Sequence, residues 1–241
     1  MPNPTAAMLV IGDEILSGRT RDSNMYHLAG ELTRVGIDLQ EVRVVGDEAE
    51  RIIAAVKALS ASYDEVFTSG GIGPTHDDIT ADCVAAAFDR HIDIRDDART
   101  LLTKAYEARG VVVTDERLRM ARIPDGAALI DNPVSTAPGF TVENVHVMAG
   151  VPKVFEAMVA SVLPGLTGGT PLLSQTWRVQ MPEGEIAGPL RGLVEAFPEL
   201  SFGSYPYSLN GVFGANIVVR GTDGAQVDAA IIRLQEVFPN D

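Results

Sequence analysis

The chain has 241 residues, of which 46% are hydrophobic and 22% charged, a composition typical of one large or two small globular domains. Lys and Arg total 19 against 33 Asp and Glu, and the formal net charge of -14 disfavours non-specific binding to nucleic acid or to an anionic membrane. The single cysteine, Cys83, excludes an internal disulfide framework and a zinc site built from cysteines. We therefore expect a reducing, cytoplasmic location.

The chain shows no pattern of a membrane or secreted protein. No segment reaches 18 consecutive apolar residues, so no transmembrane helix is expected. The apolar stretch near the N-terminus, Ala6–Ile11, is too short for a signal peptide and follows no basic region. Nucleic acid and membrane are thus not expected as partners.

The first half alternates between two hydrophobic periods. Continuous apolar or alternating runs predict three strands, at residues 6–11, 39–45 and 65–69, each followed by glycine. Apolar residues at helical spacing predict helices around residues 25–35, 52–59 and 79–88. Strands separated by helices of this length predict a doubly wound α/β fold with a mostly parallel sheet.

The middle and the end of the chain are predicted in the same way. Further helices are expected at residues 96–109, 116–122 and 152–162, and a hairpin is expected at residues 140–148. The Gly/Pro-rich segment 164–171 predicts a linker. After it, two strands (173–181 and 213–220) and two helices (185–197 and 226–237) predict a second, smaller α/β domain. The expected domains are therefore residues 1–166 and 170–241.

Three loops follow the three predicted parallel strands. They cover residues 12–18, 46–48 and 69–78. Ligands of open parallel sheets bind outside the carboxyl ends of the strands, which is where these loops are expected. The sequence therefore predicts a ligand site at this edge.

The third loop has three glycines within four residues, Gly70, Gly71 and Gly73. Glycines let backbone amides approach and surround an anion, and the hydroxyl of Thr75 adds a donor. A helix is expected just after the loop, so its N-terminal amides can also face a phosphate. The loop matches neither a P-loop nor a dinucleotide fingerprint, and an ordinary tight turn is the alternative interpretation.

Acidic residues fall on the same edge as the glycine-rich loop: Asp13, Glu14, Asp47, Asp77 and Asp78. Carboxylates beside a phosphate repel it unless a divalent cation lies between them, and Mg²⁺ is typically held by one or two carboxylates plus phosphate oxygens. This combination predicts metal-assisted chemistry at a phosphate or pyrophosphate. The alternative is that Asp77 and Asp78 only cap the next helix.

Other polar residues near these loops allow two interpretations each. His76 can act as an acid or base, or is simply exposed. Arg117, Arg119 and Arg122 either steer a phosphate or form a solvated helix face. No serine-centred elbow with a downstream His and Asp is present, so a serine-triad hydrolase is not expected.

Taken together, several segments resemble one family, the molybdopterin-binding domain of molybdenum-cofactor biosynthesis proteins and competence/damage-inducible protein A. The resemblance covers about residues 6–165 and is carried by segments in the same order. These segments are residues 11–18, 22–24, 45–48, 69–80, Asn132 with 137–140, and 149–152. The form of the glycine-rich loop and the Pro138-Gly139-Phe140 motif favour the competence-protein branch.

The C-terminal module resembles the small α/β domain that follows in that branch, through residues 203–206 and the final strand and helix. One departure is that Glu185 is followed directly by Ile186, where the family often has Glu-Ser before Ile-Ala. The longest members carry a nicotinamide-nucleotide amidase domain after this point, and we expect this chain to lack it. We therefore do not expect this chain to have the deamidase activity of those members.

The resemblance implies ligands in which a phosphate is joined to adenosine or a pterin. Cofactor-synthesis relatives adenylylate molybdopterin with Mg²⁺ and ATP. Competence-protein relatives are linked to hydrolysis of ADP-ribose-type pyrophosphates, and relatives fused to FAD synthase are linked to FAD hydrolysis. The expected cofactor is thus a divalent metal, Mg²⁺ or else Mn²⁺ or Co²⁺, with molybdopterin as a further candidate.

Site residues follow from the motif positions. Asp47 and Asp78 are expected to be catalytic, and Asp13, Asp47 and Asp78 to bind the metal. Residues expected to bind the cofactor or line its pocket are Gly12, Ser17, Gly70, Gly71, Gly73, Pro74, Thr75, Pro138, Gly139, Gly150 and Pro152.

Three function classes stay open at this point. The first is a metal-dependent hydrolase of a nucleotide-type pyrophosphate. The second is a protein that binds molybdopterin or a nucleotide without turning it over, or that has molybdopterin adenylyltransferase-like activity. The third is an interaction protein whose pocket has decayed, against which the intact acidic and glycine-rich loops argue. The relatives also lead us to expect a homo-oligomer, a dimer or trimer.

Overall fold

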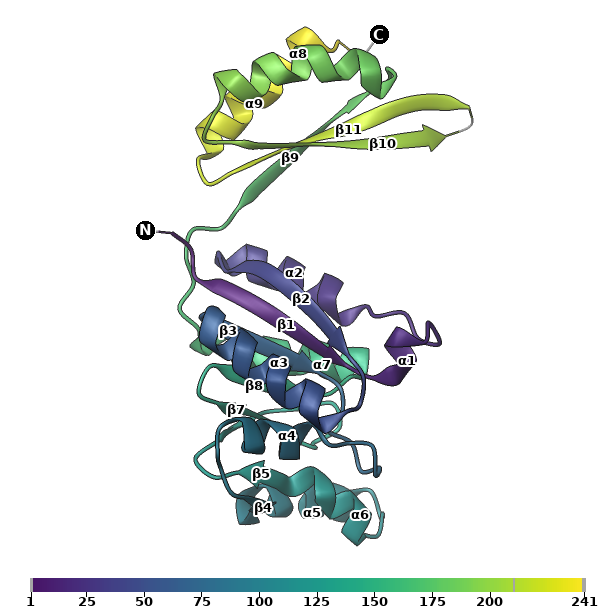
Figure 1. The fold of residues 1–241 in the computed structure, drawn as a ribbon, viewed down its shortest axis with the longest axis vertical. Helices are drawn as coiled ribbons and strands as arrows, with labels where there is room; N and C mark the ends of the chain where they lie inside the picture. Colours follow the sequence, from purple (N-terminus) through teal and green to yellow (C-terminus); the bar gives the residue numbers. More distant parts are fainter. Residues whose placement is uncertain (1, 210, 240–241) are drawn as a thin grey trace. The chain divides into compact units, whose positions relative to one another are not determined.

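The structure is a computed structural model that describes residues 2–209 and 211–239. The chain divides into two compact units, Met1–Gly169 and Thr170–Asp241. Figure 1 shows the path of the chain through each unit. None of the helices within the described ranges has the length and apolar character needed to cross a bilayer.

The first unit is built on a six-stranded sheet in the order β2-β1-β3-β8-β7-β6. Neighbours among β2, β1, β3 and β8 pair in parallel, whereas β7 and β6 continue the sheet antiparallel. The strands are β1 (Thr5–Ile11), β2 (Asp38–Val45), β3 (Glu65–Ser69), β6 (Ala128–Ile130), β7 (Gly139–Val142) and β8 (Val145–Met148). The mostly parallel α/β fold expected from the sequence is confirmed.

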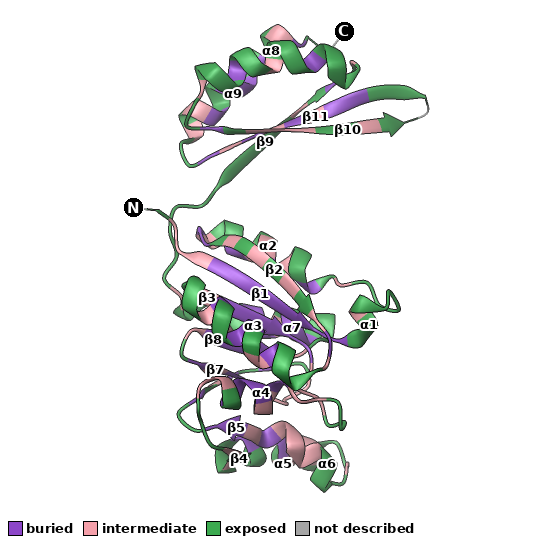
Figure 2. Cartoon of the chain, viewed as in Figure 1, coloured by how far each residue is buried: buried purple, intermediate pink, exposed green. Residues whose placement is uncertain are grey.

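Two helical layers cover the two faces of this sheet (Figure 1). Successive side chains of a strand point to opposite faces, and β1 is apolar from Ala6 to Ile11, where both of its faces are buried. Met8 and Val10 pack with α2 (Asn24–Val35) and α7 (Pro152–Val162). Leu9 and Ile11 pack with α3 (Ala49–Ser62) and α4 (Thr80–Ala87). The central strands are accordingly buried and the outer helix faces exposed, as Figure 2 shows.

A small subdomain extends the α4 side of the first unit. It contains a two-stranded antiparallel ribbon, two helices and a 3-10 turn. These elements are β4 (Ile92–Ile94), α5 (Asp96–Ala108), α6 (Asp115–Leu118), η1 (Arg119–Ala121) and β5 (Arg122–Pro124). Its core residues, such as Leu102 and Ile123, join the cluster formed by α3 and α4. The subdomain therefore holds η1 and β5 beside the start of α4.

The second unit has a three-stranded antiparallel sheet in the order β10-β11-β9, with two helices on one face (Figure 1). Its elements are β9 (Leu173–Val179), α8 (Glu183–Ala196), β10 (Ser201–Leu209), β11 (Val212–Gly221) and α9 (Gly224–Val237). Ala215, Ile217 and Val219 form the core with apolar residues of both helices. The opposite face of the sheet carries no helix of this unit.

The sequence pattern missed several short or irregular elements. Strand β10 contains Gly203, Pro206 and two serines, so it lacks the apolar alternation that reveals a strand. The short strands β4, β5 and β6 were also missed, because three residues are too few to show a period. The predicted linker is partly packed, since the Gly169 amide donates hydrogen bonds to the carbonyls of Val35 and Gly36 at 3.1 Å each.

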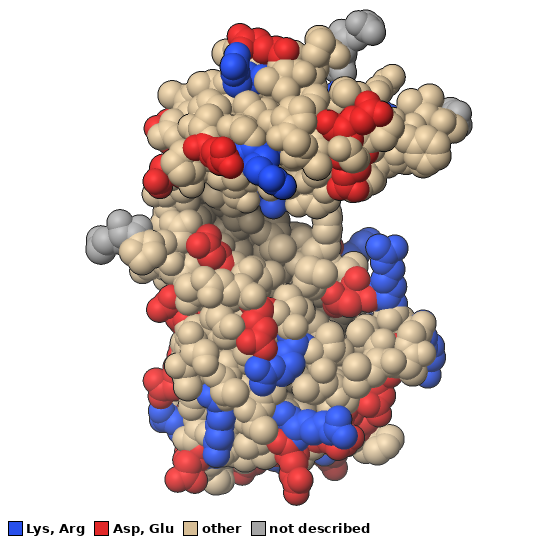
Figure 3. Space-filling model, turned by 45° about the horizontal axis from the view of Figure 1, so that its top comes forward, with Lys and Arg blue, Asp and Glu red and all other residues tan. Residues whose placement is uncertain are grey.

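Charges are interspersed on the surface. On the face drawn in Figure 3, Lys and Arg side chains lie beside Asp and Glu and do not gather into one basic patch. Pairs such as Arg34 with Glu31 and Arg51 with Glu48 are joined across one helical turn, at 2.6 and 2.8 Å. Such exposed pairs contribute little to stability.

Candidate functional site

The first two loops meet at the carboxyl edge of the parallel strands. Ile11 at the end of β1 lies in register with Val45 at the end of β2, and the Gly12 amide donates to the Val45 carbonyl at 3.1 Å. The chain then enters a single helical turn, α1 (Asp13–Leu16). The backbone amide of Asp13 donates to Asp47 Oδ2 at 2.9 Å. The fold thus brings together two of the three expected metal ligands.

The Asp13 carboxylate lies over the backbone of Gly46. A Cβ atom at position 46 would lie 2.4 Å from Asp13 Oδ1, so the space is open only because residue 46 is glycine. Burial raises the pKa of the Asp47 carboxyl, and the charges of Asp13, Glu14 and Asp77 raise it further, against the lowering effect of the Asp13 amide. Carboxylates from all three loops therefore act on one position.

The glycine-rich loop is tightly constrained where it leaves β3. Gly70 has a φ of 109°, and a Cβ atom there would lie 2.2 Å from the Ile11 carbonyl oxygen. Gly71 has a φ of 69°, and its Cβ would lie 2.1 Å from Thr80 Oγ1. Both positions accept only glycine, because a side chain would be strained and would also collide with a neighbour. The fold itself therefore requires both glycines, and phosphate binding by this loop stays a prediction.

The structure excludes the simple capping interpretation for Asp78. Helix α4 begins at Thr80, and its N-cap, Ile79, receives no side-chain hydrogen bond. Asp78 instead turns back: its Oδ2 accepts from the Thr75 amide at 2.8 Å and from Thr75 Oγ1 at 2.6 Å. Asp78 therefore shapes the loop around Gly73. A Cβ atom added at position 73 would lie 2.6 Å from the same carboxylate oxygen, so a side chain there would collide with Asp78.

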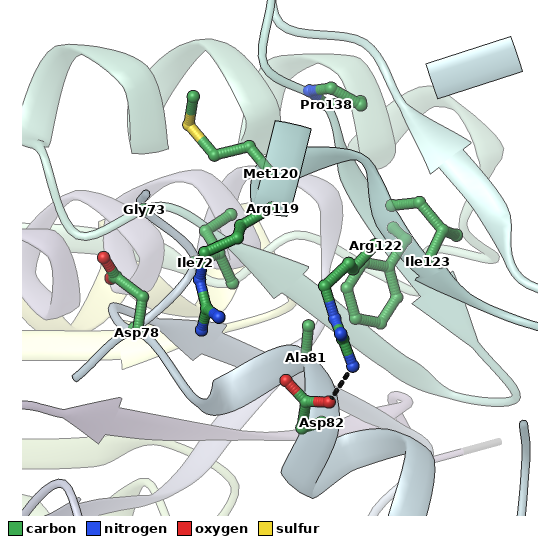
Figure 4. Close-up of a pocket in the computed structure, with 12 residues that line it drawn as sticks. Ile72, Gly73, Asp78, Ala81, Asp82, Arg119, Met120, Arg122, Ile123 and Pro138 are labelled. Carbon is green, nitrogen blue, oxygen red and sulfur yellow. Dashed lines mark hydrogen bonds and ion pairs between the residues drawn. The ribbon is translucent and has the colours of Figure 1, made fainter. Parts of the chain in front are cut away.

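A small hollow, with a cavity volume of about 20 Å³, lies between the glycine-rich loop and the subdomain. Arg119 and Arg122 extend from the η1–β5 segment toward α4, and Asp78 lies on the loop side (Figure 4). Arg122 is paired with Asp82, whereas the buried Nε of Arg119 has no hydrogen-bond partner. Both arginines are half-buried beside the hollow, so a solvated helix face does not describe them, and phosphate steering stays a prediction.

Arg117 lies elsewhere. Its guanidinium bonds to the Val112 carbonyl and stacks over the ring of Tyr106, with the guanidinium carbon 5.2 Å from the ring centroid. His76 is fully exposed, and its ring lies 3.8 Å from Asp77. Neither lines the hollow. His76 fits the exposed interpretation, whereas Arg117 is half-buried against Tyr106.

A second hollow, with a cavity volume of about 60 Å³, lies on the α2 side of the same edge and is lined by Ser69, Gly150 and Pro152, among others. Asn24, at the start of α2, is 4% exposed. Its Nδ2 donates to Ser69 Oγ at 2.7 Å and to the Gly150 carbonyl at 2.8 Å, while its Oδ1 has no partner. A Cβ at Gly150 would lie 3.3 Å from the Gly70 Cα, so the two loops pack directly.

The remaining predicted residues are spread around these two hollows. Pro138 lines the first hollow with Gly71 and Gly73. Gly139 lies within β7, where a Cβ would lie 2.4 Å from the Val147 carbonyl oxygen, and lines neither hollow. Ser17 and Pro74 are exposed and line neither hollow.

Asn24 was not predicted as a site residue. It was named only as part of the family segment 22–24. A polar residue at the start of a predicted helix is most often a cap, so its type and place gave no separate signal. Only the tertiary structure shows that Asn24 joins the start of α2 to the end of β3, through Ser69, and to the segment after β8, through Gly150.

The acidic groups fit a divalent cation only in part. Within the described ranges, no three His, Cys, Asp or Glu side chains are arranged as a metal-binding group. Asp13 and Asp47 are adjacent through their 2.9 Å hydrogen bond, which fits the one or two carboxylates that Mg²⁺ takes beside phosphate oxygens. Asp78 is committed to Thr75 and is not part of that pair.

The fold and the site define a doubly wound α/β protein with a glycine-rich candidate ligand site at the carboxyl edge of its parallel strands. Residues 7–168 match the family described as "Probable molybdopterin binding domain", and the chain belongs to this family. Residues 171–241 match the family described as "FAD synthase, middle domain". The expected family is confirmed.

Three relatives illustrate the similarity. A protein of Metallosphaera sedula is 40% identical over 66% of this chain and 62% of its own length. A "Probable FAD synthase" of Caenorhabditis elegans is 30% identical over 97% of this chain and 50% of its own. The crystal structure of "the protein CinA with unknown function" from Thermoplasma acidophilum has a TM-score of 0.62 at 34% identity, covering 67% of this chain and 98% of that one. The chain thus spans about half of the FAD synthase that it matches.

Proposed function

We propose that the first unit hydrolyses the pyrophosphate linkage of a nucleotide of the ADP-ribose or FAD class, with the help of a divalent metal. One observation carries the proposal: the Asp13–Asp47 pair, the constrained glycine-rich loop and the Arg119–Arg122 hollow lie at one edge of one sheet. Acidic groups suit a cation, and glycine amides with guanidinium groups suit phosphate oxygens. Relatives named probable FAD synthase support a nucleotide substrate.

The chain's own residues supply binding and proton transfer. The guanidinium of Arg119, which lines the hollow, donates to a phosphate oxygen, and backbone amides near Gly71 and Gly73 stabilise developing charge. Asp47 lies at the carboxyl end of β2, where its Oδ2 accepts from the Asp13 amide, and it is the carboxylate placed to act as the general base. It takes a proton from the water that attacks phosphorus, and the bond to the bridging oxygen breaks to leave two phosphate monoesters.

A divalent cation would be held by Asp13 and Asp47, and would polarise the phosphate and lower the pKa of water. A second candidate is binding without turnover, of molybdopterin or of a nucleotide. The hydrogen bonds that hold Asp78 to Thr75 favour it, because Asp78 is then a loop-shaping residue.

Phosphorus NMR of the full chain with ADP-ribose, FAD or ATP, each with Mg²⁺, Mn²⁺ or Co²⁺, tests the proposal. We expect metal-dependent loss of the pyrophosphate signals of ADP-ribose or FAD, slowed at least a hundredfold by Asp47→Asn. Glu50→Gln, which removes an exposed carboxylate in the first turn of α3, is the matched control and should leave turnover unchanged. Intact substrate in every condition, from a folded protein that still binds it, would replace the hydrolase with the binding function.

A further inference from the structure

The open face of the second unit's sheet carries a second candidate site. Ala215, Ile217 and Val219 point to the helices, so the alternate residues Asn216 and Arg220 point to the opposite face. Strand pairing places Tyr205 opposite Asn216, and Asn216 opposite Arg178. An aromatic ring, an amide and a guanidinium therefore form one row across the three strands.

Glycines let the two tyrosine rings lie against the sheet. A Cβ at Gly203 would lie 2.7 Å from Tyr205 Cε2, and a Cβ at Gly214 would lie 2.5 Å from the Tyr207 hydroxyl. The Arg178 guanidinium carbon lies 4.1 Å from the centroid of the Tyr207 ring. Tyr207 is thus covered on both sides, by Gly214 and by Arg178.

The ring of Tyr205 is partly exposed. It rests against Gly203, and its hydroxyl accepts a hydrogen bond from Arg220 Nη2 at 3.1 Å. The residue as a whole is 46% exposed. The Arg220 guanidinium carbon lies over the ring, 5.9 Å from its centroid, at the outer limit of a cation–π contact. The ring is therefore held in place by its neighbours, and its exposed part is available for stacking.

The strands of this unit differ in charge from its helices, which carry both acidic and basic residues. Strands β9, β10 and β11 contain Arg178 and Arg220 and no Asp or Glu in their described residues. The acidic residues of the secondary structure of this unit lie on its helices, at Glu183, Glu185, Glu195, Asp228 and Glu236. In a chain of net charge -14, a sheet face with only positive charge suits an anionic ligand.

We propose that this face, defined by Tyr205, Asn216, Arg178 and Arg220, binds a planar ring that carries phosphate, such as a single nucleotide. The ring stacks on Tyr205, the Asn216 amide bonds to its edge, and the arginines bind phosphate oxygens. A single-stranded nucleic acid needs successive stacking surfaces, and here the second ring is covered by Arg178. This proposal uses residues of the second unit alone and does not rest on the proposed hydrolytic function.

The test is an amide NMR titration of the full chain with ADP in the absence of divalent metal. We expect saturable shifts at residues 203–207 and 214–218, and smaller ones with adenosine, which lacks phosphate, or with inorganic phosphate, which lacks the ring. Tyr205→Leu and Arg178→Gln should each weaken binding about tenfold or more. Arg191→Gln, an equal charge change on α8, should leave it unchanged.

Shifts confined to the first-unit loops would overturn this proposal and leave the hydrolase intact. Shifts at residues 203–207 without any hydrolysis would support the nucleotide site on the second unit and overturn the proposed hydrolase. If Arg191→Gln weakened ADP binding as much as Arg178→Gln, the effect would come from net charge alone and the proposed site would be wrong. Preferred binding of an oligonucleotide, or self-association in sedimentation that Tyr205→Leu abolishes, would assign the face to another partner.

Discussion

The two units present chemistry to solvent in different ways. In the first, loops leave the carboxyl edge of a parallel sheet, and Gly70 is fixed by contact with the Ile11 carbonyl. In the second, side chains such as Tyr205 and Arg178 stand on the open face of an antiparallel sheet. The candidate site of the first unit is formed by loops whose backbone conformation is constrained. The candidate site of the second unit is formed by side chains on regular strands. The first site should therefore be far more sensitive to substitutions that disturb the fold.

The largest expected effect is that of Gly70→Ala. The added Cβ would lie 2.2 Å from a backbone oxygen, at a φ of 109°, so we expect a loss of about 3 kcal/mol or more in the free energy of unfolding. Gly18→Ala is the control, because Gly18 also has a positive φ, 72°, but has nothing within 4 Å of the new atom. It should cost about 1 kcal/mol. Urea denaturation measures both, and equal losses would show that the contact with Ile11 does not matter.

A matched asparagine pair compares the two units directly. Asn24→Ala leaves the Gly150 carbonyl and Ser69 without a buried donor, so we expect a loss of about 2 kcal/mol. Asn216→Ala makes the same change on the open sheet face and should alter the free energy of unfolding by less than about 0.5 kcal/mol. Chemical denaturation measures both variants. If Asn216→Ala costs as much as Asn24→Ala, the proposed contrast between the units is wrong.

The smallest expected effect is the pH dependence caused by Asp47. Burial and neighbouring carboxylates raise its pKa in the folded state above the ordinary value of 3.8, so between these two values the folded state binds more protons than the unfolded state. Stability contributed by this group is complete below pH 3.8 and is lost as the pH rises through the folded pKa.

The measurement is the melting temperature as a function of pH, with and without Mg²⁺. Asp47→Asn should remove this decline and, at pH 7, should be slightly more stable than the native chain. Mg²⁺ should raise the melting temperature of the native chain more than that of the variant, because the cation offsets the same repulsion. Glu50→Gln should follow the native curve in both respects. If the melting temperature of the native chain depended on pH in the same way as that of Asp47→Asn, the proposed repulsion at Asp47 would be wrong.

The sequence by itself determined much of the architecture. Strands β1 and β3 and helices α2 and α7 were predicted within a residue or so, because each has a clear period and ends at a glycine or begins at a proline. The doubly wound α/β order followed from that alternation, and so did the expectation that three loops share one edge of the sheet. These features depend on local pattern and on the chirality of crossovers, which sequence contains.

Only the tertiary structure decided which residues act together. Asp78 bonds to Thr75 and does not cap α4. Arg119 and Arg122 line a hollow because the subdomain folds back beside the loop. The row on the second sheet depends on the register of strand β10, which has no apolar period of its own. Hydrophobic pattern specifies which face of an element is buried, whereas contacts between distant side chains depend on how the elements pack.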